Sequence, residues 1–316
     1  MVKNYKYIIA IVILTLLIVW TFILNDDKDE KTNSKESKKI VSLSTFVLHD
    51  IAKHIVGDTL ELVKIIPNGV DVHSFEPTPK IMAKVEKSAL VIYNGAGLEP
   101  WLSSFNFKGK AIGIAKFIKL KHLNKDHAKE HEHHGHTCSH SSFDPHFWLD
   151  VENMKDAANI MTYEFIRLEP KHKLLYLGNR NKYTQMLDSL DAAYKKGLKN
   201  CELNTIITNH NAFSYLSDKY DFNVSALKGL SPDAQSAPKD MIRIIEAIEK
   251  YKTPVVFFED FSNAKSMQTL ARQANVKIDS LHTLGNVTKD DVEHKRTYED
   301  IMLSNLEKIT KALVCQ

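Results

Sequence analysis

Short apolar segments and amphipathic segments alternate along the chain, and the same pattern appears twice. The first half contains three apolar segments typical of β-strands, at residues 40–44, 60–66 and 89–93. It also contains two amphipathic segments typical of helices, at residues 45–56 and 80–88. The second half repeats this alternation, with strands predicted at 205–208, 255–258 and 276–280 and helices at 212–220, 238–251, 263–274 and 298–314. Strands that alternate with helices indicate parallel sheets covered by helices.

Between the two halves the pattern is helical. Residues 151–168 predict one helix, and residues 171–199 predict a second with apolar side chains at helical spacing. This second helix would be about 40 Å long, enough to run along two lobes. The predicted fold class is α/β: two lobes, each with a central, mostly parallel sheet flanked by helices, joined by one long backbone helix. The expected boundaries are 40–168 for the N-terminal lobe, 169–199 for the linking helix and 200–316 for the C-terminal lobe.

The N-terminal residues form no part of the predicted lobes. Residues 8–24 are an uncharged apolar run that follows Lys3 and Lys6, at the short end of the length that spans a bilayer. No small-residue cleavage site follows the run. We therefore expect residues 1–25 to be an uncleaved anchor in the cytoplasmic membrane and residues 26–39 to be a charged tether to extracytoplasmic lobes. The alternative is a cleaved signal sequence and a protein that is soluble in the periplasm.

The composition is that of an ordinary globular protein. The 316 residues are 43% hydrophobic and 26% charged, and the net charge is only +3. A small net charge made of mixed signs gives no indication of a nucleic-acid-binding surface. The sequence has no Gly-rich phosphate loop and no nucleophile elbow, and we expect a monomer.

Histidines gather in one polar segment, residues 122–142. Together with His146, it holds eight of the fifteen histidines of the chain and has almost no apolar side chain. Such a segment cannot bury enough apolar surface to order itself, so we expect a loop without fixed structure. Imidazole suits zinc, copper and nickel, and we expect accessory metal capture at His127, His131, His133, His134, His136 and His140. The alternative is a low-complexity segment with no metal function.

Four metal-competent side chains outside this segment occur where strands or loops end. His73 follows a strand and a turn, His146 follows the histidine-rich segment, His210 follows the strand at 205–208, and Asp279 lies at the end of the strand at 276–280. Sites in parallel sheets form at the carboxyl ends of strands. Three imidazoles and one carboxylate, two ligands from each lobe, form a set that zinc favours in tetrahedral geometry.

Several ordered motifs then resemble one known family. Residues 71–79 read DVHSFEPTP and are similar to the pattern DPHxYEPTP of the metal receptors of ABC importers. Residues 94–102 resemble the family's NGxGLExW, residues 144–150 its DPHxWLDP and residues 210–216 its HxAFxYL, and Phe258-Glu259 matches its FE. The resemblance covers the chain from about Ile40 to the C-terminus. It implies two lobes linked by a rigid helix, with metal ligands at the positions of His73, His146, His210 and Asp279.

The resemblance also implies a function that is not enzymatic. We expect a solute-binding protein that captures Zn²⁺ outside the cytoplasmic membrane and delivers it to an ABC permease with its ATPase. Manganese-type members carry a glutamate at the position of His210, so a histidine there favours zinc. The sequence departs from the family pattern at Val72 and Val151, where proline is usual. Because Ser280 stands where proline is usual, Asp279 is the weakest of the four ligand assignments.

Other polar residues have expected supporting roles. Glu76, Glu99 and Glu259 are candidates to orient the imidazoles from behind, whereas His282 and Asp260 are expected at the surface. Cys201 and Cys315 are a candidate disulfide, which would leave Cys138 as the free thiol.

Three alternatives to a zinc receptor stay open at this stage. The first is an exported zinc hydrolase, with three histidines, an open coordination position and Glu76 or Glu259 as base. The second is a metal chaperone or sequestering protein without a permease, and the third is a receptor for manganese. Because ligation needs neutral imidazoles, metal affinity is expected to fall as the pH drops below about 6.5.

Overall fold

The computed structural model describes residues 13–15, 20, 37–104, 107–122, 143–229, 238–259 and 265–316. The chain divides into two units, Met1–Lys38 and Lys39–Gln316, and the second contains both lobes. Nearly all of the predicted anchor and tether lie outside the described residues, as do Asp260 and residues 123–142, which include the six predicted metal-capturing histidines and Cys138. Within the described part of the chain, no helix is long and apolar enough to cross a membrane.

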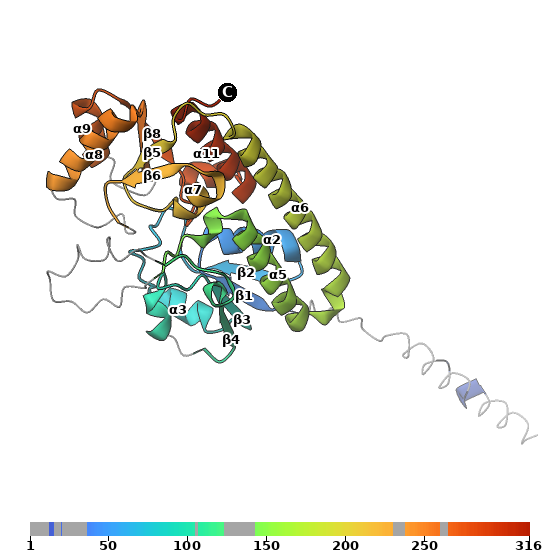
Figure 1. Ribbon diagram of the computed structural model, residues 1–316. Coiled ribbons are helices and arrows are strands. Elements are labelled where there is room, and N and C mark those ends of the chain that lie inside the picture. The colour runs from blue at the N-terminus through green and yellow to red at the C-terminus, as the bar shows by residue number, and fades with distance from the viewer. Residues whose placement is uncertain are drawn as a thin grey trace, which may run out of the picture. The chain divides into compact units, whose positions relative to one another are not determined.

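The first lobe is built on a four-stranded parallel sheet with the strand order β2-β1-β3-β4 (Figure 1). Its elements are β1 (Ile40–Leu43), α2 (Phe46–Val56), β2 (Glu61–Lys64), α3 (Pro79–Val85), β3 (Leu90–Tyr93) and β4 (Lys110–Gly113). The central strands β1 and β3 are almost wholly buried. They are continuous short apolar runs because helices and loops cover both faces of a parallel sheet.

The second lobe repeats this topology in the order β6-β5-β7-β8, again with all strands parallel. Its elements are β5 (Thr205–Thr208), α7 (Ser214–Tyr220), β6 (Asn223–Ala226), α8 (Pro238–Tyr251), β7 (Val255–Glu259), α9 (Lys265–Gln273), β8 (Lys277–Leu281), α10 (Lys289–Glu293) and α11 (Tyr298–Ala312). The predicted arrangement of two α/β lobes with parallel sheets is confirmed, and in each the first strand lies beside the second and the third.

Two strands escaped the sequence-based prediction, β4 and β6. Each is an edge strand of four residues, at the end of its sheet, with one neighbour only. An edge strand is buried less than a central one, so its residues need not form the apolar run that identifies a strand. The sequence signal was therefore weak in both cases.

Two helices connect the lobes, α5 (Val151–Leu168) and the long α6 (Lys173–Gly197). The two helices pack side by side, and α6 extends beyond α5 to α11 of the second lobe (Figure 1). Tyr183 of α6 donates a hydrogen bond to Asp50 of α2 in the first lobe, and Tyr194 donates one to the carbonyl of Met302 in α11. Both tyrosines are buried, so α6 is fixed to both lobes by its own side chains.

The loop after β8 joins the second lobe to the first. The carbonyl of Thr283 accepts a hydrogen bond of 2.7 Å from the indole of Trp148, and Asn286 Nδ2 donates to the carbonyls of Pro67 and Val70 at 2.6 and 2.8 Å. A side chain at Gly285 would bring its Cβ to within 3.1 Å of the Val72 side chain. Glycine therefore allows this loop to pack closely on the segment that carries His73.

A disulfide joins Cys201, four residues before β5, to Cys315 near the end of the chain. The two cysteines also form an isolated antiparallel bridge. The bond closes 114 residues of chain and so encloses the whole second lobe.

Candidate metal centre

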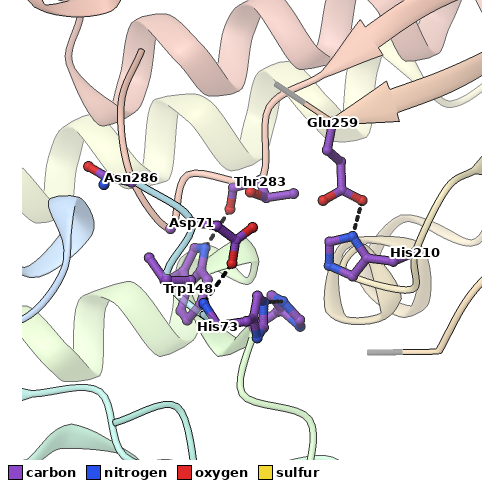
Figure 2. A pocket seen from close by; sticks show the side chains of 10 residues that line it. Asp71, His73, Trp148, His210, Glu259, Thr283 and Asn286 are labelled. Atoms are coloured by element: carbon purple, nitrogen blue, oxygen red, sulfur yellow. Dashed lines mark hydrogen bonds and ion pairs between the residues drawn. The ribbon is translucent and has the colours of Figure 1, made fainter. Parts of the chain in front are cut away.

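Three histidines from separate segments meet in one cluster, His73, His146 and His210. One ring nitrogen from each lies within 4.8 Å of those of the other two, and no other such cluster is found among the described residues. His73 belongs to the loop after β2, His146 precedes the short 3₁₀-helix at the start of α5, and His210 follows β5. Figure 2 shows His73 and His210 among the side chains that line the pocket. The cluster thus takes two ligands from the first half of the chain and one from the second lobe.

The first two histidines are the closest pair. Their Nε2 atoms lie 3.2 Å apart and their ring centroids 5.2 Å apart. The centroid of His210 lies 5.8 Å from that of His73 and 5.4 Å from that of His146. This arrangement directs nitrogen lone pairs toward one small volume, which suits a cation with short ligand bonds.

The same Asp-x-His turn holds both histidines of the first pair. Asp71 Oδ1 accepts a hydrogen bond from the backbone N–H of His73 at 2.7 Å, and Asp144 Oδ1 accepts one from that of His146 at 3.0 Å. Asp144 Oδ1 also contacts His146 Nδ1 at 2.8 Å. A carboxylate on Nδ1 fixes the ring so that Nε2 is the lone-pair nitrogen that faces the cluster.

The second lobe fixes Asp144 in turn. Ser214, at the start of α7, donates a short hydrogen bond to Asp144 Oδ2, and Tyr215 of the same helix donates to its carbonyl at 3.0 Å. The orientation of His146 therefore depends on contacts between the lobes.

The third histidine has its own carboxylate. Glu259, the last residue of β7, contacts Nδ1 of His210, and both side chains are buried. β5 and β7 are the two central strands of the second sheet, and their connections leave in opposite directions. His210 and Glu259 therefore lie at the topological switch point of this sheet, the place where parallel sheets form their binding sites. Nε2 of His210 is buried and has no hydrogen-bond partner within the described part of the chain.

Burial and mutual proximity shift the titration of the ligands. Desolvation lowers the pKa of His73 well below the ordinary value for histidine, and the charges of His146 and His210 lower it further. Desolvation likewise lowers the pKa of His210, with a second contribution from His146. Burial raises the pKa of Asp144, but the hydrogen bonds from His146 and Ser214 outweigh this and leave it below its usual range. The lowered pKa values of His73 and His210 favour their neutral imidazoles, the protonation state that binds a metal.

The walls of the site come from both lobes. Besides the three histidines and Glu259, they consist of Asp71, Val72, Trp148, Thr283, Gly285 and Asn286. Trp148 is fully buried, so it shields one side of the cluster from water and raises the strength of electrostatic contacts there.

Three of the carboxylates expected at the site lie elsewhere. Asp279 is within β8, which continues to Leu281; its side chain is half exposed and lies 3.4 Å from Lys308 Nζ. Glu76 is exposed, and Glu99 is buried at the carboxyl ends of β1 and β3. There Glu99 accepts hydrogen bonds from Ser44, Asn94 and Gly95. The structure does not bring Asp279, Glu76 or Glu99 to the three histidines.

The prediction that His282 lies at the surface is wrong. Its side chain is buried, its Nδ1 accepts the backbone N–H of Leu284, and its Nε2 lies 3.2 Å from Asp291. Arg296 and Thr288 also bond to Asp291. Burial raises the pKa of Asp291, but the hydrogen bonds from His282 and Thr288 outweigh this and hold it below its usual range. His282 thus shapes the loop that closes on the first lobe.

Asp71 and Asp144 orient two of the histidines but are not among the residues predicted for the site. A signal was present: each stands two residues before a proposed histidine ligand. A short acidic side chain at that spacing can accept the backbone N–H two residues on, the turn that both form here. The repetition of the pattern at two ligands identifies them as residues that orient the site.

Three clustered imidazoles from two lobes of the same topology, two of them buried, define a two-lobed metal-binding protein. Each ring is held by its backbone or by a carboxylate. Residues 41–312 match the family described as "Zinc-uptake complex component A periplasmic", ZnuA. The chain is 30% identical over 297 residues to the high-affinity zinc uptake system protein ZnuA of Bacillus subtilis, with 92% of each chain covered. It is 29% identical to the manganese ABC transporter substrate-binding lipoprotein PsaA of Streptococcus pneumoniae, with 95% of this chain and 97% of that one covered.

A solved structure agrees with this assignment. The Zn(II)-bound ZnuA-like domain of AdcA from Streptococcus pneumoniae matches with a TM-score of 0.72 at 26% identity, over 87% of this chain and 99% of that chain. The chain belongs to the ZnuA family. Members of this family are extracytoplasmic zinc-binding receptors that work with the permease and ATPase of ABC importers, and they are not enzymes.

Proposed function

We propose that this protein captures Zn²⁺ outside the cytoplasmic membrane and delivers it to an ABC permease. The observation that carries the proposal is the cluster of His73, His146 and His210, with an unpartnered Nε2 on His210 buried among the other two rings. A buried polar atom without a partner costs free energy. A cation at the centre of the three rings would remove that cost by accepting the lone pair.

The proposed ligands are these three histidines. Glu259 behind His210 and Asp144 behind His146 orient the rings and increase their basicity, as carboxylates commonly do behind metal-bound imidazoles. Three nitrogen ligands favour zinc over manganese, which prefers carboxylate, carbonyl and water oxygens. Asp279 is no part of the proposed ligand set, because its carboxylate is in the body of β8 beside Lys308.

Ligands from both lobes suit capture and release. His210 comes from the second lobe, and the loop carrying His73 contacts that lobe through Asn286 and Gly285. An ion bound to all three rings therefore links the lobes, and a small relative movement of the lobes weakens its bonds. The rigid attachment of α6 to both lobes limits that movement, so we expect release to need contact with the permease rather than a wide spontaneous opening.

The histidine-rich segment is proposed as an accessory collector of metal. Its two described ends, His122 and Phe143, pair as an antiparallel bridge, with ring centroids 4.4 Å apart. The segment thus leaves and re-enters the first lobe at one place, three residues before His146. Weak, exchanging imidazole ligands attached there would raise the local concentration of zinc beside the permanent site.

We further propose that the protein acts as a monomer held to the membrane by its N-terminal apolar run, residues 8–24. The run is followed by a charged stretch before Lys39, where the folded unit begins. An uncleaved helix would keep the receptor close to its permease.

The test of the proposed function is a metal titration that separates zinc from manganese. Purified protein is titrated by calorimetry with each ion, in the wild-type form and as His210→Glu. We expect one tight zinc site in the wild type and weak manganese binding; His210→Glu should lose zinc affinity and narrow the difference between the two ions. Equal affinity of the wild type for both ions would contradict the choice of zinc.

A further inference from the structure

A basic and apolar surface lies at the corner where α5 ends and α6 begins, which we call the corner surface. It consists of Arg167, Lys171, Lys173, Leu174 and Leu175, together with Lys39 at the start of the folded unit. Leu174 is 84% exposed, although it is a large apolar side chain in the first turn of a helix. Neither Leu174 nor Leu175 joins the two hydrophobic clusters that the described residues form.

The charge of this surface is positive because its acids are turned inward. Glu169 and Glu164 are only 14% exposed, and each is paired with two bases, Lys39 and Lys171 for the first and Lys110 and Arg167 for the second. The basic ends stay outside: Arg167, for instance, is 74% exposed. Solvent and any partner therefore meet the bases and the two leucines.

The position of the bases is unfavourable for the isolated helix. α6 has no acidic residue in its first turn, and Lys171 and Lys173 flank its N-terminus, the positive end of the helix dipole. Like charges at that end cost some stability unless an anion approaches. An anionic partner would relieve the repulsion, and the exposed leucines give it an apolar contact as well.

The chain itself indicates what that partner is. Lys39 Nζ donates a 2.7 Å hydrogen bond to the carbonyl of Leu168 and pairs with Glu169, so the folded unit begins directly at the corner surface. The apolar run ends at Leu24, and the fourteen residues between it and Lys39 reach at most about 50 Å. A bilayer that held the run would therefore lie within reach of this corner.

We propose that the corner surface rests on the surface of a bilayer that contains anionic lipid. Lys39, Arg167, Lys171 and Lys173 contact the headgroups, while Leu174 and Leu175 enter the interface, as the apolar residues of interfacial helices do. This contact would set the orientation of the two lobes on the membrane. It rests on the proposed N-terminal anchor, which supplies the high local concentration that a small surface needs.

The test uses the full chain reconstituted into vesicles of phosphatidylcholine and phosphatidylglycerol in a ratio of 3:1. In a Cys138→Ser background, Leu174→Cys carries an environment-sensitive fluorophore, and Ile242→Cys in α8 serves as the matched control. Ile242 is also an exposed apolar side chain, but it lies in the second lobe, away from the start of α6 (Figure 1). Quenching by a nitroxide attached to the lipid chains reports contact with the bilayer.

We expect quenching at position 174 at least threefold stronger than at position 242. It should fall to the control level in vesicles of phosphatidylcholine alone, and in the variant Arg167→Glu with Lys171→Glu. Reversal of two exposed bases of the second lobe, Lys289→Glu with Lys295→Glu, should leave it unchanged.

A chain that stays with the vesicles during a carbonate wash is anchored in the bilayer. If such a chain shows equal quenching at positions 174 and 242, the proposed contact of the corner surface is wrong, although the anchor is supported. Loss of the chain in that wash would instead contradict the anchor, and with it the membrane contact that depends on it. Protection of the probe at position 174 without quenching by the lipid would indicate a second copy of the chain on this surface and would also overturn the proposal.

Discussion

Nε2 of His73 and Nε2 of His146 lie 3.2 Å apart. Two nitrogens that bind one zinc ion in tetrahedral geometry, at bonds of about 2.0–2.1 Å, are separated by about 3.3 Å. The first two ligands are therefore already at the separation that the ion requires. The pair is set by its two Asp-x-His turns, so the ordering of these rings is achieved in folding rather than in binding.

The first prediction concerns the ligand set. His146→Ala removes one of three nitrogen ligands and should weaken zinc binding at least about 100-fold, whereas His294→Ala, an exposed histidine of the same lobe as His210, should leave it unchanged. Asp279→Asn should change the affinity less than about twofold, because Asp279 is paired with Lys308 instead. Competition with a chromophoric chelator measures all three. A loss in Asp279→Asn as large as in His146→Ala would mean that the carboxylate reaches the ion after all.

The second prediction concerns the carboxylate behind His210. Glu259→Gln keeps the shape of the side chain but removes its charge, so His210 loses basicity and orientation. Zinc affinity should fall by about 10- to 100-fold, the usual effect of changing such a partner. Glu76→Gln, at an exposed position, is the matched control and should have no effect. An unchanged affinity in Glu259→Gln would show that His210 needs no carboxylate to bind the ion.

The third prediction concerns pH. Desolvation lowers the pKa of His73 and of His210 well below the ordinary value, so both rings stay neutral as the pH falls through 6.5. At these two rings protons compete with zinc only when the pH falls through the lowered pKa values. Zinc affinity should therefore be nearly constant from pH 8 to about 6.5 and fall below that range, at a lower pH than ordinary histidines would predict.

The same shifts predict the stability of the metal-free protein. Below about pH 6.5 the unfolded chain binds protons on these two histidines and the folded chain does not, so the free energy of unfolding should decrease as the pH falls. Chelator competition and urea unfolding between pH 8 and pH 5 measure both effects. A tenfold loss of zinc affinity between pH 8 and pH 7 would contradict the neutral, desolvated site.

The parts of the fold that depend on local pattern were predictable from the sequence. β5 and β7 are short runs of apolar and β-branched residues, and each is fully or mostly buried, as such runs predict. His210 could be placed at the site because it directly follows β5. Two of the four edge strands, β4 and β6, were not predictable in this way, since a strand at the edge of a sheet can form with fewer apolar residues.

The parts that depend on distant contacts were not predictable. Asn286 bonds to the carbonyls of Pro67 and Val70, more than 200 positions earlier in the chain. His282 was predicted at the surface, yet it is buried, and its two ring nitrogens have partners in Asp291 and the backbone N–H of Leu284. Asp279 was expected at the end of a strand, but β8 continues for two more residues, and so its carboxylate stays away from the site.

The fourth prediction tests the contact between the lobes at Asn286. Asn286→Ala leaves the carbonyls of Pro67 and Val70 without this donor and should lower the free energy of unfolding by about 2 kcal/mol. Because Val70 precedes the turn that holds His73, zinc affinity should decrease as well. Asn181→Ala, at the outer face of α6, is the control and should change neither quantity by a measurable amount. Urea unfolding of the metal-free protein gives the first quantity, and a stable Asn286→Ala variant would contradict the role of this loop.

The central claim is that the permanent zinc site consists of the three clustered histidines and not of the histidine-rich segment. Calorimetric titration with zinc of the unit from Lys39 to Gln316, with and without residues 124–142, tests it most directly. We predict one tight site that survives the deletion, with loss of the weaker additional binding only. Loss of all tight binding on deletion would contradict the account and would assign the function to the segment itself.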